Sequence, residues 1–137
     1  MRQSIRTASC DRRDAEARLA QAKKFLELAD VVATEREQSA AADGAASLGI
    51  LAGIAASDAA CCVVLGRRSR SQSHTDAELL LREIKPAGDQ AAKALRRLLS
   101  IKDKANYGIE SVSGKNLNAV LKHAKTLVDF AEEAMRQ

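Results

Sequence analysis

Aromatic residues are nearly absent from this 137-residue chain, which contains no Trp, one Tyr and two Phe. A core must therefore be built from Leu, Val, Ile and Ala, and the usual stacking of nucleic-acid bases on aromatic rings is disfavoured. The chain has a single Pro, and its apolar residues recur at helical spacing almost throughout. The length suits one domain. We therefore predict one all-α domain over residues 1–137, with residues 1–10 as a flexible tail.

Cysteines and common catalytic motifs are also scarce. The cysteine count is odd and two of the three are adjacent, which is typical neither of a disulfide framework nor of a zinc site. We expect Cys10, Cys61 and Cys62 to be reduced thiols in a cytoplasmic protein, with Cys61 and Cys62 packed as small apolar side chains. HExxH, P-loop and GxSxG motifs are lacking, and no metal or cofactor is expected.

The charge balance is mildly basic, with a formal net charge of +4 and a pI of about 9.1. It permits an anionic partner such as RNA or a nucleotide without requiring one. The first sixteen residues are basic but contain no apolar h-region, so they do not resemble a signal peptide.

The stretch Ala45–Leu65 is apolar on almost every side and carries one charge, Asp58. Its length and its GxxxG motif, Gly49 and Gly53, would suit a membrane span. A mid-span carboxylate, the small residues and the lack of flanking aromatic belts favour the central helix of a bundle instead. We therefore expect no membrane insertion.

Amphipathic helices flank this stretch on both sides. The first helix of the chain is predicted over about residues 11–37. The second helix is the apolar stretch itself, and it ends at the C-cap Gly66. A third begins near Thr75, is kinked or broken near Pro86 and continues to Asn106, and a last helix follows the N-cap Ser113. The predicted fold is an antiparallel up-and-down four-helix bundle.

Two polar residues occupy the apolar face of the third helix. Lys102 lies one heptad after Leu95, and Asn106 lies four residues further on. They either form an internal cationic site for a phosphate or carboxylate, or lie where the bundle opens to water. Asp58 needs a partner if it is buried. Lys102 is favoured as that partner or as its neighbour in a shared cleft, and a helix terminus or a cationic group of a partner subunit are the alternatives.

A second group of candidate ligand-binding residues lies in the basic loop that precedes the third helix. Arg67, Arg68, Arg70 and His74 are the residues concerned. Guanidinium groups suit phosphate, and His is the natural acid–base group near neutral pH. A basic run in a serine-rich loop is more often a solvated surface, and both interpretations stay open.

Two stretches together resemble the HEPN superfamily, and more narrowly small actinobacterial HEPN-like helical proteins. The first is GIAASDAACCVVLGRRSRSQSHTDAELLL, a small-residue helix, a basic loop and a His-led helix. The second is ALRRLLSIKDKANYGIESVSGKNLNAVLKHAKTLVDFAEEA, with a basic residue, Ala-x-Tyr and a capped last helix. The resemblance implies a homodimer of helical bundles that binds RNA or nucleotides, or pairs with a nucleotidyltransferase in a toxin–antitoxin system.

Catalytic members of that superfamily use an Arg, a polar residue and a His for metal-independent RNA cleavage. By position, Lys102, Asp103 and Tyr107 would replace them, so the Arg and the His are both missing. Arg68 and His74 have an R-x5-H spacing but lie at the wrong place in the helix order. The resemblance thus implies a dimer that binds RNA or nucleotide without catalysis, at a site including Lys102 and Tyr107. A degenerate ribonuclease toxin and a protein-interaction module are the alternatives.

Overall fold

The computed structural model describes residues 5–70, 74–106 and 111–137, with the backbone alone for residues 103–106. The described chain is mostly helical, so the all-α class is confirmed. The helices and strands, in chain order, are β1 (Thr7–Ser9), α1 (Arg12–Ala33), α2 (Ser39–Leu65), β2 (Arg67–Ser69), α3 (Thr75–Arg82), α4 (Gly88–Asn106) and α5 (Gly114–Arg136).

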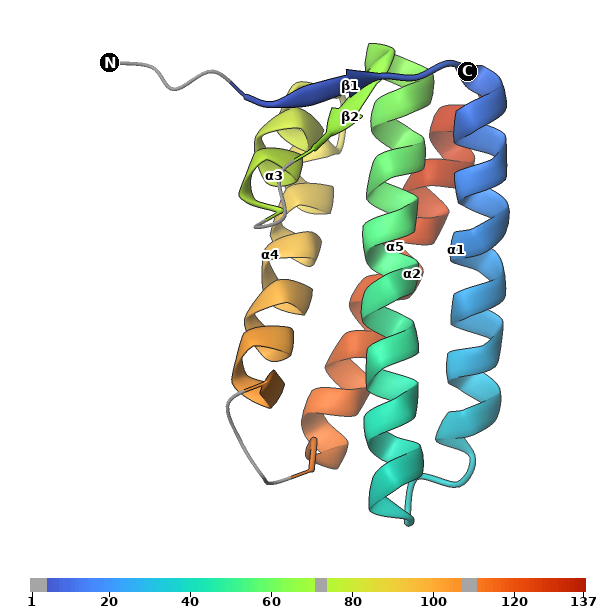
Figure 1. Ribbon diagram of the computed structural model, residues 1–137, viewed down its shortest axis with the longest axis vertical. Coiled ribbons are helices and arrows are strands. Elements are labelled where there is room, and N and C mark those ends of the chain that lie inside the picture. Colours follow the sequence, from blue (N-terminus) through green and yellow to red (C-terminus); the bar gives the residue numbers. More distant parts are fainter. Residues whose placement is uncertain (1–4, 71–73, 107–110) are drawn as a thin grey trace.

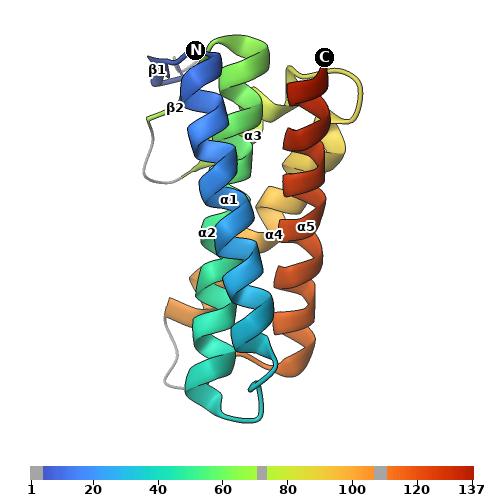
Figure 2. The same cartoon turned by 90° about the vertical axis from the view of Figure 1, so that its right-hand side faces the viewer.

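The four long helices alternate in direction. In Figure 1, α1 descends, α2 ascends, α4 descends and α5 ascends, and the short α3 lies beside the upper end of α4. Helix α2 packs against α1, α5 and α4, whereas α1 and α4 lie on opposite sides of it (Figure 1). Figure 2 shows that α1 begins and α5 ends at the same end of the molecule.

Helix α2 forms the centre of the core because its small side chains allow close approach on several sides. Ala52, Ala55, Ala56 and Ala59 are fully buried. At Gly53 an added Cβ would lie 2.3 Å from Leu98 Cδ1, so α4 reaches the α2 backbone at that point. The helix is long and apolar enough to cross a membrane, but most of that apolar window is buried inside the protein, as in a core helix.

The amphipathic faces predicted for the outer helices are largely present. In α1 the buried face consists of Ala15, Leu19, Ala22, Leu26, Ala29 and Ala33, which recur at helical spacing. In α5 the buried face consists of Leu117, Val120, Ala124, Leu127, Val128, Ala131 and Ala134, and Leu121 beside it is partly exposed. In α3, Leu80 and Leu81 are fully buried, whereas Leu79 is 47% exposed.

Several helix ends differ from the prediction. Helix α1 begins at a capping box, in which Asp11 and Asp14 accept hydrogen bonds from each other's backbone amides. It ends at Ala33, before the predicted Glu37, because the following residues turn through i to i−3 hydrogen bonds. Helix α2 begins at Ser39, six residues early, since the alanines before Gly44 favour helix strongly enough to tolerate one Asp-Gly pair.

Other ends agree with the prediction. Gly66 ends α2 in the left-handed conformation, with φ of 72°, and Ser113 caps α5 by accepting a hydrogen bond from the Asn116 amide. The predicted third helix consists of two helices, α3 and α4, with Pro86 between them. Gly88 is required at the start of α4, because a Cβ there would lie 2.1 Å from the Leu81 carbonyl oxygen.

A two-stranded sheet lies across the end of the bundle and was not predicted. Strands β1 and β2 pair antiparallel, with Thr7 opposite Ser69 and Ser9 opposite Arg67. The Arg70 amide extends the pairing by donating to the Arg6 carbonyl at 2.9 Å. Strand β1 falls within the ten residues that the sequence suggested as a tail. Strands of three residues carry too little pattern to be recognised in a sequence.

Two cysteines are joined, so the expectation of three reduced thiols is wrong. Cys10 and Cys62 form a disulfide with a Cα–Cα distance of 5.3 Å, across 52 positions of sequence. The antiparallel return of α2 brings its last turn beside the start of α1, which sequence spacing alone does not reveal. Cys61 stays a free thiol and is buried, as predicted for that residue.

Candidate anion-binding site

A pocket of about 300 Å³, which we call the basic pocket, lies where α1, α2, β2 and the start of α3 meet. Three of its wall residues are arginines and one is a carboxylate. The lining residues are Arg18, Ile54, Asp58, Arg68, Ser69, Arg70 and His74. Four of the predicted candidates, distant in the sequence, therefore share one wall: Asp58, Arg68, Arg70 and His74.

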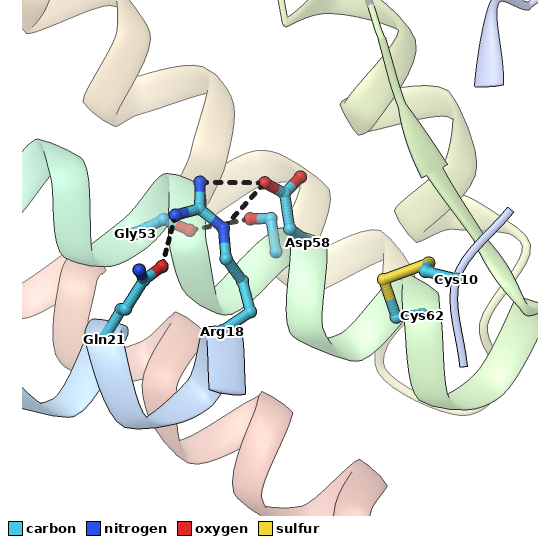
Figure 3. A network of polar contacts seen from close by, with 7 residues as sticks. Cys10, Arg18, Gln21, Gly53, Asp58 and Cys62 are labelled. Carbon is cyan, nitrogen blue, oxygen red and sulfur yellow. Dashed lines mark hydrogen bonds and ion pairs between the residues drawn. A yellow bond between two sulfur atoms is a disulfide. The ribbon is translucent and has the colours of Figure 1, made fainter. Parts of the chain in front are cut away.

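Asp58 is paired with Arg18 of α1. The Arg18 Nε and Nη2 atoms both donate to Asp58 Oδ2, at 3.1 and 3.0 Å (Figure 3). Arg18 Nη1 donates to the Gln21 side chain at 2.7 Å, which holds the guanidinium plane from its other edge. The prediction that Lys102 pairs with Asp58 is therefore wrong. Asp58 is nevertheless largely shielded from solvent, as the sequence suggested, with 12% of its side chain exposed.

Burial dominates the electrostatics of Asp58. It raises the pKa of this carboxyl, although the charge of Arg18 and its hydrogen bond oppose the rise. Arg68 and His74 oppose it more weakly. The carboxylate is thus an internal anchor for Arg18, which keeps a cation at the pocket wall.

His74 stands at the N-cap of α3 with a φ of 60°, in the left-handed region that non-glycine residues rarely adopt. Burial lowers the pKa of its imidazole, and the Lys102 charge lowers it further, while Asp58 acts in the opposite direction. The imidazole is therefore neutral near pH 7, and one of its nitrogens can accept a proton. Lys102 does not line the basic pocket, but its charge acts on the pKa of His74, which does.

The sheet positions two of the arginines. Arg68 is the central residue of β2, opposite Ala8 of β1, and Arg70 follows the strand with its amide bonded to Arg6. Both arginines are exposed, so solvent and solutes reach them. Arg67, the remaining arginine of this group, points elsewhere and pairs with Glu83 at 2.9 Å.

A second, larger pocket of about 570 Å³ adjoins the basic pocket and shares Arg18 and Arg68 with it. The disulfide forms part of its wall. Its lining residues are Ser9, Cys10, Asp14, Ala17, Arg18, Gln21, Cys62 and Arg68. Figure 3 shows the Arg18–Asp58 pair and the disulfide along the same helix, α2.

For three of the predicted site residues the structure describes no side chain. Tyr107 is outside the described residues, and so are the side chains of Asp103 and Asn106. The sequence analysis did not single out Arg18 as a candidate site residue. One signal could have found it, because Arg18 borders the apolar face of α1 between Ala15 and Ala22 and a buried Asp58 required a cation.

The chemistry available at the basic pocket is that of anion recognition, with guanidinium forks and a neutral imidazole. Within the described part of the chain, no three His, Cys, Asp or Glu side chains lie together so as to hold a metal ion. Comparison with protein-family models, curated proteins and solved structures finds no match.

Proposed function

We propose that this chain is a HEPN-like up-and-down bundle of four helices, the third broken near Pro86, that binds a phosphate group of RNA or of a nucleotide without catalysis. The observation that carries the proposal is the basic pocket, where Arg18, Arg68 and Arg70 line one cavity beside His74. Because Asp58 neutralises only one of the three guanidinium groups, the cavity keeps a positive potential that attracts anions.

The two unpaired arginines supply the ligand contacts. Within the described residues, the ion pairs include Arg18 but neither Arg68 nor Arg70. A guanidinium can donate two parallel hydrogen bonds to a phosphate, and each charge-assisted bond contributes about 1.5–3 kcal/mol. Arg18 acts mainly as a fixed charge, since Asp58 and Gln21 already accept from it.

Fluorescence anisotropy with a labelled single-stranded oligoribonucleotide, with ATP as competitor, tests the proposal. Replacing both arginines, as in R68A/R70A, should weaken binding by at least about 10- to 100-fold, which corresponds to the loss of one such bond. Arg13→Ala is the matched control, because Arg13 is an exposed arginine of α1 away from the basic pocket. Equal affinity of the double variant and the wild type would refute the proposal.

We also propose a homodimer, as the family resemblance implies. Leu28 and Val31 of α1 and Leu51 of α2 are large apolar side chains that are 42%, 60% and 47% exposed. These are the side chains that a self-association surface on α1 and α2 would bury. Light scattering at micromolar concentration is the test, and a monomer would contradict the dimer.

Metal-independent ribonuclease activity is the second candidate, favoured by one observation. Arg68 and His74, at R-x5-H spacing, line the same pocket. A neutral His74 could take the proton from a ribose 2′-hydroxyl, while Arg68 stabilises the charge that develops on the phosphate. Incubating RNA with the protein in the presence of EDTA distinguishes the two functions. Intact RNA excludes the ribonuclease, whereas cleavage that His74→Asn abolishes would favour it.

A further inference from the structure

We propose that the Cys10–Cys62 disulfide is a site of reversible thiol–disulfide exchange, and that its reduction releases β1 and with it the β2 wall of the basic pocket. The release of β1 stands on the fold alone. The consequence for ligand binding rests on the proposed function.

The sheet depends on the disulfide because its strands are very short. Two paired strands of three residues are not stable on their own in water. Beyond the ladder, and within the described residues, β1 and its neighbours are held by two hydrogen bonds, by the packing of Ile5 against the core, and by the disulfide. The hydrogen bonds run from the Cys10 amide to the Gly66 carbonyl at 3.0 Å and from the Arg6 amide to Asp76 Oδ2 at 3.4 Å. The disulfide is the one covalent link among them.

The same sheet carries the pocket wall. Arg68 and Ser69 lie in β2 and Arg70 directly after it, and each line the basic pocket. Residue 70 is also held by its amide bond to Arg6. If β1 leaves, β2 loses its partner strand, and Arg68 and Arg70 lose the backbone support that orients their guanidinium groups.

The disulfide is open to attack from one side. Both cysteines line the larger pocket, Cys10 is partly exposed, and Cys62 is 3% exposed. Cys10 Sγ is therefore the sulfur that an external thiol would attack. Cys61, next in sequence to Cys62, does not compete, because it is 2% exposed and burial raises its pKa to about 12.

The exchange needs a dithiol as reductant. A thiolate of the dithiol attacks Cys10 Sγ and forms a mixed disulfide, the bond between the two protein sulfurs breaks, and the Cys62 sulfur leaves as a thiolate that takes a proton. The second thiolate of the reductant then attacks the reductant sulfur that is bonded to Cys10 in the mixed disulfide. Cys10 leaves as a thiolate and is protonated in turn. The protein gains two electrons and two protons, and the dithiol becomes a cyclic disulfide.

Hydrogen–deuterium exchange of the full chain, oxidised and then reduced with dithiothreitol, is the primary test. We expect exchange at residues 5–10 and at the Arg70 amide to rise by about tenfold or more on reduction, while the buried amides of α2 and α5 keep their protection. Mass spectrometry verifies the reduction. Cys10→Ser should resemble the reduced state without reductant, and Cys61→Ala, which keeps the disulfide, should resemble the oxidised wild type.

Two exchange results would overturn the proposal: an unchanged Arg70 amide in fully reduced protein, or a loss of protection over the whole fold, which would make the disulfide purely structural. Anisotropy with the labelled oligoribonucleotide completes the test. Binding that weakens on reduction and returns on reoxidation is the expected result. Equal binding in both states refutes control of the pocket. Faster hydrogen–deuterium exchange on reduction, with no RNA binding in either state, would refute the proposed function but support the release of β1.

Discussion

Arg18 and Asp58 lie 40 positions apart and form a two-point contact in which both Nε and Nη2 of the guanidinium donate to one carboxylate oxygen. The pair connects α1 to α2 beside the basic pocket. Its two members are unequally buried, with 35% of the Arg18 side chain exposed against 12% of the Asp58 side chain. Removing either partner therefore has different consequences.

Arg18→Met should lower the free energy of unfolding by about 1–3 kcal/mol near neutral pH, because it leaves a buried carboxylate without its cation. Asp58→Asn should cost less, since the amide oxygen still accepts from Arg18 and the freed charge reaches water. Burial already raises the pKa of Asp58, and the loss of Arg18 raises it further. A raised folded-state pKa favours the fold at low pH, so the deficit of Arg18→Met should shrink as the pH falls.

Urea unfolding at several pH values measures this effect, with the exposed Arg13→Met as control. A deficit that is the same at every pH would contradict the assigned role of the pair.

Gly53→Ala should destabilise the protein by about 1–3 kcal/mol through overpacking, even though Ala favours helix over Gly by about 1 kcal/mol. The new Cβ would lie 2.3 Å from Leu98 Cδ1 and 3.2 Å from Leu127 Cδ1, and both leucines are fully buried. Gly44→Ala in the same helix is the matched control, because its Cβ would meet only Val32 Cγ1 at 3.9 Å. We expect Gly44→Ala to stabilise. Thermal unfolding compares the two variants, and a Gly53→Ala protein as stable as the wild type would argue against the close approach of α4 to α2.

His74→Asn should flatten the pH dependence of stability on the acid side. Burial lowers the pKa of His74 in the fold, so the unfolded chain binds its proton more readily. The stability that the neutral imidazole provides is therefore present above the ordinary value of 6.5 and is lost as the pH falls through the lower folded value. Asn tolerates the left-handed backbone at this position, which makes it the suitable replacement.

His123, whose pKa burial also lowers, adds a loss of the same sign. The variant should therefore be compared with His123→Gln and with the double variant. Parallel pH profiles for wild type and His74→Asn would refute the burial of a neutral His74.

Cys61 should resist alkylation in the folded chain. Burial raises its pKa to about 12, so almost no thiolate is present at moderately alkaline pH, and the side chain is shielded. We expect iodoacetamide to leave the folded, oxidised protein unlabelled, and unfolding without reductant to expose one reactive thiol per chain. Mass spectrometry counts the labels. Labelling of the folded protein would show that the end of α2 opens.

The sequence interpretation was most successful where a few neighbouring residues decide the outcome. The apolar face of α1, the left-handed Gly66 and the Ser113 cap all follow from local spacing and local hydrogen bonds. It was wrong at the ends of α1 and α2, where helix propensity and turn formation are closely balanced. It paired Lys102 with Asp58 because both were expected on buried faces. The sequence does not give the relative positions of the two residues along the axes of their packed helices.

By itself, then, the sequence determined that the chain is helical, that Ala45–Leu65 is a core helix candidate, and that Asp58 needs a partner, such as a cation, if it is buried. These conclusions rest on periodicity and on the cost of burying an unpaired charge. Only the tertiary structure decided that the cation is Arg18, that Cys10 meets Cys62, and that β1 and β2 gather Arg68, Arg70 and His74 around one pocket. Each of these contacts depends on the axial register between chain segments that run in opposite directions, and helical periodicity carries no information about that register.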